Sequence, residues 1–176
     1  MSDTTRRERF EQTVLPHLGA AYNLARWLTR NDQDAQDVTQ EACLRAFRFF
    51  DGYQGGNMRA WLLTIVRNTC YTWLHKNRAP GFGEVFDEEI HSAEISGSAD
   101  PEIQTLASAD KETLQRALEE LPEVFREALV LREMEGMSYR EIADVMSVSL
   151  GTVMSRLARA RTRSRQSLSV ELSTGY

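Results

Sequence analysis

Residues 137–163 read MSYREIADVMSVSLGTVMSRLARARTR, and this stretch decides the fold of the C-terminal part of the chain. Its pattern predicts a short helix, a tight turn and a second helix. Ser138 and Glu141 have the spacing of a capping box, in which hydroxyl and carboxylate cap the helix start reciprocally. Ser149 is placed to cap the second helix, with Thr152 three residues on. The apolar residues that would lock the two helices together are Ile142, Val145, Val148, Val153 and Leu157.

The second helix carries a row of arginines. Arg156, Arg159 and Arg163 follow one another at steps of three and four residues, so they share one helix face. A narrow cationic face fits the major groove, where arginine pairs with guanine and contacts phosphates. Arginine-rich faces are commonly just solvated, but the caps, the turn and the apolar pattern together make DNA the leading candidate partner.

The composition indicates a soluble protein of one or two small domains. The 176 residues are 41% hydrophobic, which is enough for packed cores. No apolar run approaches a membrane span and the polar N-terminus lacks a signal-peptide core, so we expect a cytoplasmic protein. Cys43 and Cys70 form no CxxC motif, which favours buried thiols over a disulfide or a redox switch. The three histidines form no metal-ligand pattern, and we expect neither a metal nor a cofactor.

The net charge of −5 hides an uneven distribution of charge. Residues 1–78 hold eleven Lys/Arg and eight Asp/Glu, whereas residues 79–110 hold eight acidic residues and no basic one. Residues 111–144 carry a net −4, and residues 145–176 carry +4. Local fields determine what docks where, so the negative total does not argue against a nucleic-acid partner.

Hydrophobic periodicity favours helix throughout, so the expected fold class is all-α. Residues 79–100 begin Ala-Pro-Gly-Phe-Gly and lack a regular apolar face, which predicts a flexible acidic linker. We therefore expect a helical domain near 1–78 and a second near 101–170, a four-helix domain that contains the helix-turn-helix. Residues 2–5 and 169–176 are expected to fray. The expected helices are Pro16 to Leu28, 33–50, 58–77, 101–120 and Pro122 to Gly136. A glycine-rich loop is expected at 51–57. The apolar face of helix 33–50 includes either Leu44 or Cys43.

Six aromatic residues between positions 49 and 73 are interleaved with cations. Single-stranded nucleic acid is bound by this combination, because bases stack on rings while phosphates pair with cations. Most of these rings have core spacing, so we expect only two or three to face a ligand, and Phe50 and Tyr53 at the loop are the better candidates. Asn68 is either a satisfied surface residue of a helix or a base reader.

Residues 8–168 resemble the extracytoplasmic-function (ECF) sigma factors of bacterial RNA polymerase. DAQDVTQEACLRAFR at 34–48 is similar to the family's region 2.1–2.2 helix, and MRAWLLTIVRNTCYTWL at 58–74 to its region 2.3–2.4 helix. LPEVFREALVLREMEG at 121–136 and GTVMSR at 151–156 resemble its region 4. Two such matches in the right order are a specific signal, whereas region 4 alone is not, because many regulators share its helix-turn-helix.

The resemblance implies that the first domain binds core RNA polymerase and opens the minus-ten promoter element. Helix 34–48 would contact the clamp helices of the beta-prime subunit through Asp34, Asp37, Gln40 and Glu41, an acidic face that also suits the start of a helix by itself. The loop after it would hold a flipped base. The residues implied in minus-ten binding are Phe50, Tyr53, Asn57, Arg59, Arg67 and Asn68.

The resemblance implies that the second domain binds the beta flap of polymerase and places helix 149–165 in the minus-thirty-five element. The residues implied in DNA contact there are Thr152, Ser155, Arg156, Arg159 and Arg163. Met154 stands where many relatives carry a basic residue, so polar readout by that side chain is in doubt. The acidic linker would thread a basic cleft of the polymerase, and an anti-sigma factor would hold the protein in check.

The main alternative is a helix-turn-helix transcriptional regulator that acts alone, with an effector or dimerisation domain at residues 1–78. Tight, specific binding to duplex DNA without polymerase in a gel shift would favour it. An all-α enzyme is a further alternative, but no metal cluster, phosphate loop or nucleophile motif supports it, so we do not expect an enzyme. An RNA-binding module is the last, and competition between duplex and single strands would test it.

Overall fold

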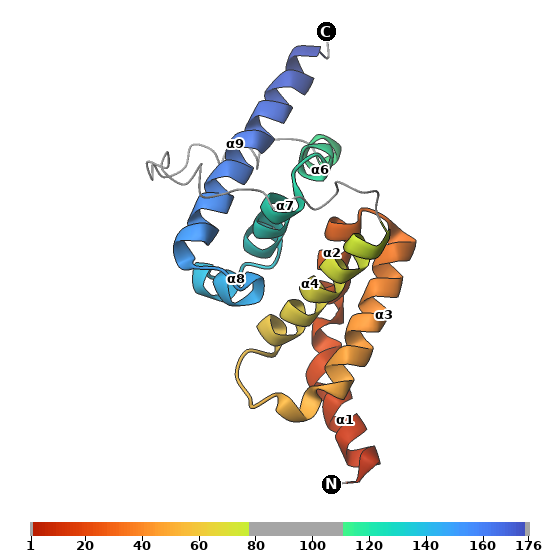
Figure 1. Ribbon diagram of the computed structural model, residues 1–176. Helices are drawn as coiled ribbons and strands as arrows, with labels where there is room; N and C mark the ends of the chain where they lie inside the picture. The colour runs from red at the N-terminus through yellow and green to blue at the C-terminus, as the bar shows by residue number, and fades with distance from the viewer. Residues whose placement is uncertain (1, 78–110, 175–176) are drawn as a thin grey trace. The chain divides into compact units, whose positions relative to one another are not determined.

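The computed structural model describes residues 2–77 and 111–174 of the chain. Every regular element in these two ranges is helical, which confirms the predicted all-α class. The chain divides into two compact units, of which the first holds residues 2–77 and the second nearly all of 111–174 (Figure 1). The predicted linker and the expected helical residues 101–110 lie outside the described residues. Among the described residues, no helix is long and apolar enough to span a bilayer.

Four α-helices and two 3₁₀ turns build the described part of the first unit (Figure 1). Helices α2, α3 and α4 pack pairwise against one another. Buried alanines on α2 and α3 let these helices approach closely, while leucines and valines fill the remaining space. The elements are α1 (Asp3–Val14), η1 (Leu15–His17), α2 (Leu18–Thr29), α3 (Asp32–Arg48), η2 (Phe50–Gly52) and α4 (Met58–Asn77).

Local signals in the sequence explain where α2, α3 and α4 begin and end. Arg30 has a φ of 58° and ends α2 in the left-handed conformation. Asn31 then caps α3, because its side-chain oxygen accepts a hydrogen bond from the Asp34 amide at 3.0 Å. Asn57 does the same for α4 through the Ala60 amide at 3.1 Å. The predicted helix 58–77 is therefore confirmed with both of its bounds.

The N-terminal residues do not fray as expected. Helix α1 begins at Asp3, and the Ser2 hydroxyl caps it by accepting from the Thr5 amide at 3.3 Å. Phe10 anchors the helix through edge contacts with the rings of Phe47 and Phe50, at centroid distances of 5.1 and 5.4 Å. These contacts join residues about 40 positions apart, so no local pattern in the sequence announced them.

The second unit contains four helices in its described part, as predicted, when α7 and the π-helical turn that continues it are counted as one (Figure 1). Helix α9 packs along α6 and α7. The helix continues to Thr174, so the expectation of fraying from residue 169 is wrong for the described residues. The elements are α6 (Lys111–Glu119), α7 (Glu123–Leu129), η5 (Val130–Met134), α8 (Tyr139–Met146) and α9 (Leu150–Thr174).

A fully buried arginine joins α6 to α7. The Arg126 guanidinium donates to the backbone carbonyl oxygens of Glu119, the last residue of α6, and of Leu121, two residues further on. Its Nη2 also lies 3.6 Å from a carboxylate oxygen of Glu123. A helix end leaves carbonyl groups without helical partners, so this arginine satisfies groups that would otherwise be buried at a cost.

Candidate nucleic-acid and polymerase interfaces

The predicted helix-turn-helix forms from α8 and α9, with every predicted cap in place. The Ser138 hydroxyl accepts from the Glu141 amide at 3.1 Å, and the Glu141 carboxylate accepts from the Ser138 amide at 3.0 Å. The Ser149 hydroxyl caps α9 through the Thr152 amide at 3.2 Å. The predicted locking residues Ile142, Val145, Val153 and Leu157 are buried, and Val148 is half-buried.

Polar contacts hold α9 against the turn that precedes α8. The Arg161 guanidinium lies 3.1 Å from a carboxylate oxygen of Glu133 in η5. Burial by itself lowers the pKa of Arg161, but hydrogen bonds to Glu133 and Tyr139 outweigh it and raise the pKa above its ordinary value. Arg132 lies 4.7 Å above the ring of Tyr139 and donates to the carbonyl of Met137 at 2.8 Å. Arg161 therefore faces the interior of its unit. The sequence did not show this, because Arg161 is one of five closely spaced arginines between residues 156 and 165.

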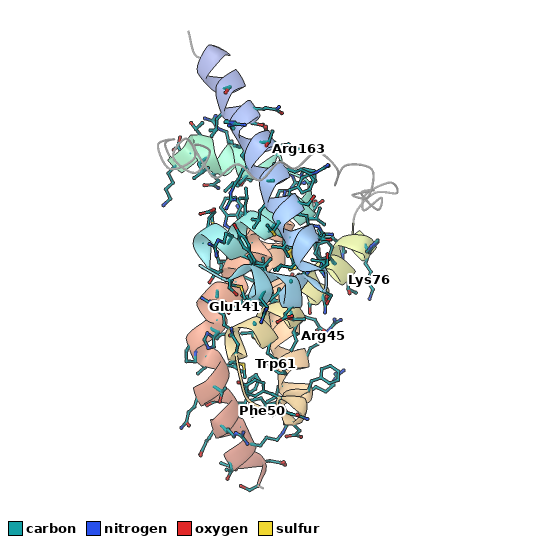
Figure 2. The ribbon with its side chains drawn as sticks, turned by 90° about the vertical axis from the view of Figure 1, so that its left-hand side faces the viewer. Arg45, Phe50, Trp61, Lys76, Glu141 and Arg163 are labelled. Atoms are coloured by element: carbon teal, nitrogen blue, oxygen red, sulfur yellow. The ribbon has the colours of Figure 1, made fainter. Side chains whose placement is uncertain are left out.

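The five residues expected to contact duplex DNA differ in how open they are. Arg163 is exposed, and its guanidinium carbon lies 5.1 Å from the ring centroid of Phe125 (Figure 2). Thr152, Arg156 and Arg159 are half-buried. Ser155 is only 6% exposed, so its hydroxyl is not open to a base here, which differs from the expectation. A serine side chain is short, and longer neighbours on a helix cover it readily.

Two large apolar side chains near the start of α9 are open to solvent. Leu150 is 46% exposed and Met154 is 50% exposed. They lie one helical turn apart on the same side of the helix. The doubt about polar readout at Met154 stays a prediction, and the exposure of Leu150 was not anticipated.

The prediction that Phe50 faces a ligand is wrong, because Phe50 belongs to the core of the first unit. It is 5% exposed, with Phe10 against its edge and Tyr53 stacked at 6.3 Å. The neighbouring Phe49 is 58% exposed. Helix α3 ends at Arg48, and the chain passes through the cap residue Phe49 into η2, so one ring is left exposed and the next is buried. Sequence spacing could not place this turn to within one residue.

The loop that follows is fastened at both ends. The Tyr53 hydroxyl donates to the Gly56 carbonyl at 2.7 Å. The centroid of the Tyr53 ring lies 5.3 Å from that of Trp61, which is labelled in Figure 2. Gly55 and Gly56 have φ angles of 90° and 93°, which side chains rarely tolerate. Asn57 ends the loop as the cap of α4. The exposed tip between these anchors is therefore shaped by two glycines.

The polar residues expected at the minus-ten element line one end and one side of α4. Asn57 and Asn68 are exposed, while Tyr53, Arg59 and Arg67 are half-buried. The Arg67 guanidinium carbon lies 4.6 Å above the ring of Tyr71, and Arg67 donates to the side-chain oxygen of Asn68 at 3.5 Å. Asn68 is thus exposed on the helix surface, so it can be either a satisfied surface residue or a base reader, and both predictions stay open.

The predicted polymerase-binding face of α3 is open to solvent. Asp37, Gln40 and Glu41 are exposed and Asp34 is half-buried. Leu44, one turn further on, is 59% exposed and extends this face. Of the two residues left open for the apolar face, Leu44 or Cys43, Cys43 is the more buried one, and Ala42 and Ala46 lie in the core. We call Asp34, Asp37, Gln40, Glu41 and Leu44 the α3 face.

Neither cysteine has the features of a redox switch. The two cysteines form no disulfide, Cys70 is buried, and burial raises the pKa of the Cys43 thiol, which disfavours the reactive thiolate. Within residues 2–77 and 111–174, no three His, Cys, Asp or Glu side chains are grouped so that they could hold a metal ion.

Two family models match the chain. Sigma-70 region 2 matches residues 13–79, and Sigma-70 region 4 matches residues 111–163. The RNA polymerase sigma-H factor of Pseudomonas aeruginosa is 34% identical over 161 residues, which cover 88% of this chain and 83% of that protein. The ECF RNA polymerase sigma-E factor of Escherichia coli is 37% identical over 134 residues, or 73% and 70% of the two chains. This chain belongs to the ECF sigma factors of RNA polymerase.

The family relation extends to other organisms and to solved structures. The ECF RNA polymerase sigma factor SigE of Mycolicibacterium smegmatis is 36% identical over 90% of this sigma factor, which spans 61% of that relative's length. The sigma factor RpoE of Bartonella quintana, solved with the anti-sigma factor NepR, matches with a TM-score of 0.69 and 30% identity, covering 93% of this chain and 98% of that one. CnrH, solved with the cytosolic domain of CnrY, matches with a TM-score of 0.58 and 26% identity, covering 97% and 91%.

Proposed function

We propose that this sigma factor positions core RNA polymerase on a promoter through two separate DNA contacts, one made by each unit. The observation that carries the proposal is that one chain holds both a capped helix-turn-helix with a cationic second helix and a glycine-shaped loop flanked by aromatic and amide side chains. A regulator that acts alone needs only the first. We assign the two functions to residues 101–170 and 1–78, with residues 79–100 as the connection.

The upstream contact is made by α9 in the major groove of the minus-thirty-five element. The capped N-terminus of this helix favours phosphate, and Arg156 and Arg159 supply the charge-assisted donors that pair with guanine or phosphate. Thr152 lies at the same end of the helix, and Arg163 follows one turn after Arg159. Ser155 contacts DNA only if complex formation uncovers its hydroxyl.

The downstream contact is made on the unpaired strand of the minus-ten element. The tip of the loop lies between Tyr53 and Asn57, and Asn57 and Asn68 offer exposed amides that can read the edge of an extruded base. Arg59 and Arg67 are the nearby cations for the backbone. Phe49 replaces Phe50 as the ring that a base can stack on, because it is the exposed one of the two.

The polymerase contact is made by the α3 face. Its acidic and amide side chains suit a basic helical partner, here the clamp helices of the beta-prime subunit. Leu44 supplies an exposed apolar group at the end of that face, where it can be buried as an anchor. The second unit binds the beta flap. In this arrangement polymerase performs the chemistry and the sigma factor is not itself an enzyme.

An anti-sigma factor controls the protein in our proposal, because the sigma factor RpoE of Bartonella quintana named above was solved with the anti-sigma factor NepR. We place the protein in the bacterial cytoplasm, where polymerase and promoter meet.

The division of labour between the units is tested by permanganate footprinting of promoter complexes, since permanganate oxidises thymines in unpaired DNA. Phe49→Ala and Asn68→Ala should reduce thymine reactivity in the minus-ten element by roughly tenfold, as expected for about 1–3 kcal/mol of stacking or base contact, while promoter binding at the upstream element persists. Phe49→Tyr keeps a ring and is the matched control. Unchanged reactivity in both alanine variants would contradict the assignment.

A further inference from the structure

The exposed apolar residues at the start of α9 form a strip with a regular spacing. Leu150, Met154 and Ala158 follow one another at steps of four residues, so they lie along one side of the helix. Leu150 and Met154 are about half exposed, and Ala158 is half-buried. The core-facing side of the same helix is a different one, formed by Val153, Leu157 and Ala160. The strip is therefore distinct from the core-facing side of α9 and leaves apolar surface of Leu150 and Met154 open to solvent.

The position of the strip points to DNA as its occupant. The first turns of the second helix of a helix-turn-helix are the part that approaches base edges in the major groove. Residues 150–169 contain five arginines and no Asp or Glu, and although Arg161 pairs with Glu133 inside the unit, Arg156 and Arg159 near the strip leave a charge that complements phosphate. In the major groove the apolar group on a base edge is the C5 methyl of thymine.

The chemistry of methionine fits this target. A thioether offers no strong hydrogen-bond donor, so Met154 cannot pair with guanine as an arginine at the same position would. Its unbranched side chain has three rotatable bonds and adapts to an apolar neighbour. Burying it against a methyl group removes apolar surface of both partners from water.

We propose that Met154 is a specificity residue that recognises the C5 methyl of a thymine in the upstream promoter element, with Leu150 and Ala158 extending the apolar contact along the groove. The inference rests on the proposed insertion of α9 into the minus-thirty-five element. The inference adds a base preference to that function: at the base pair that Met154 contacts, the protein prefers thymine to any base without a methyl group.

Uracil substitution tests the proposal at the level of one methyl group, because uracil pairs as thymine does and lacks only the C5 methyl. Each thymine of the upstream element, on either strand, is replaced singly by uracil in a promoter mapped for this sigma factor. Binding of the holoenzyme is then measured for the wild type and for Met154→Ala. The wild type should lose about fourfold in affinity at one or two positions, the worth of one buried methyl, and Met154→Ala should show no such loss there.

Three controls separate the inference from its premises. Met154→Leu keeps an apolar side chain and should retain the uracil penalty. Arg159→Ala should weaken binding to all of the DNA fragments while the penalty persists. Met154 is exposed, so its replacement should leave the melting temperature unchanged, which a thermal melt checks.

The outcomes are distinguishable. If the wild-type holoenzyme binds the promoter but no uracil position costs affinity, or if Met154→Ala keeps the same penalty, the inference is overturned while the proposed function stands. If the holoenzyme does not select the promoter at all, the proposed function itself fails. A Met154→Ala variant with unchanged promoter affinity but weakened binding to an anti-sigma factor would assign the strip to a protein partner and overturn the proposal.

Discussion

The two units differ in how their DNA-facing sites are assembled. In the second unit, the helix-turn-helix depends on side chains three residues from their partners, such as Ser138 with Glu141 and Ser149 with Thr152. In the first unit, the aromatic site depends on contacts across the fold. Phe10 packs on Phe47, and Arg6 bonds Asp51 at 3.0 Å from 45 residues away. The caps of the second unit are local contacts and the ring contacts of the first unit are tertiary, so each set should fail in its own way.

The largest effect should come from the buried ring of the first unit. Phe50→Ala removes a core side chain that contacts both Phe10 and Tyr53, so we expect a loss of about 3–5 kcal/mol in the unfolding free energy of that unit. Phe49→Ala, the matched variant one residue earlier, should change stability by about 0.5 kcal/mol or less. Urea denaturation followed by circular dichroism measures both.

Equal destabilisation by these two variants would show that Phe49 also belongs to the core and would remove it from the proposed base contact. The two units need not unfold together, so the denaturation curve is fitted with two transitions.

A smaller effect is expected at the cationic helix of the second unit. Arg159→Ala should cost about 1–3 kcal/mol in promoter binding by the holoenzyme and lower the salt slope of binding by about one if the contact is to phosphate. Arg163→Ala should cost less, because its guanidinium lies against the ring of Phe125 within the unit. Titrations of labelled promoter at several salt concentrations compare the two.

A larger loss for Arg163→Ala than for Arg159→Ala would mean that the DNA-facing side of α9 is rotated from the one we assign.

The smallest effect is expected at a helix cap, where the local character of the second unit is tested directly. Ser149→Ala removes the acceptor of the Thr152 amide and should destabilise that unit by about 1 kcal/mol. Ser149→Asp keeps a capping oxygen and should restore most of that loss. Thermal melts of the two variants give the comparison, and a full loss in both would show that the hydroxyl acts in some way other than as a cap.

The same contrast explains what the sequence could predict. Caps, turn and apolar spacing were enough to place α8 and the start of α9, because these signals act between close neighbours. Phe50 was misplaced, and the choice between Leu44 and Cys43 stayed open, because burial is decided by how the helices of the unit pack and a shift of one residue on a helix reverses it. The roles of Arg126 and Arg161 were overlooked for a related reason. The sequence alone does not distinguish an arginine that donates to a buried carbonyl or pairs inside a unit from one that is solvated.

The most direct test of the central claim is transcription in vitro by core RNA polymerase with this protein added and the start sites mapped. The account predicts new start sites that depend on the protein, each with shared upstream and downstream elements. Asn68→Ala should reduce open-complex formation at these promoters, and Arg159→Ala should reduce promoter binding. No new initiation, together with tight and specific binding to duplex DNA in the absence of polymerase, would contradict the claim and favour a regulator that acts alone.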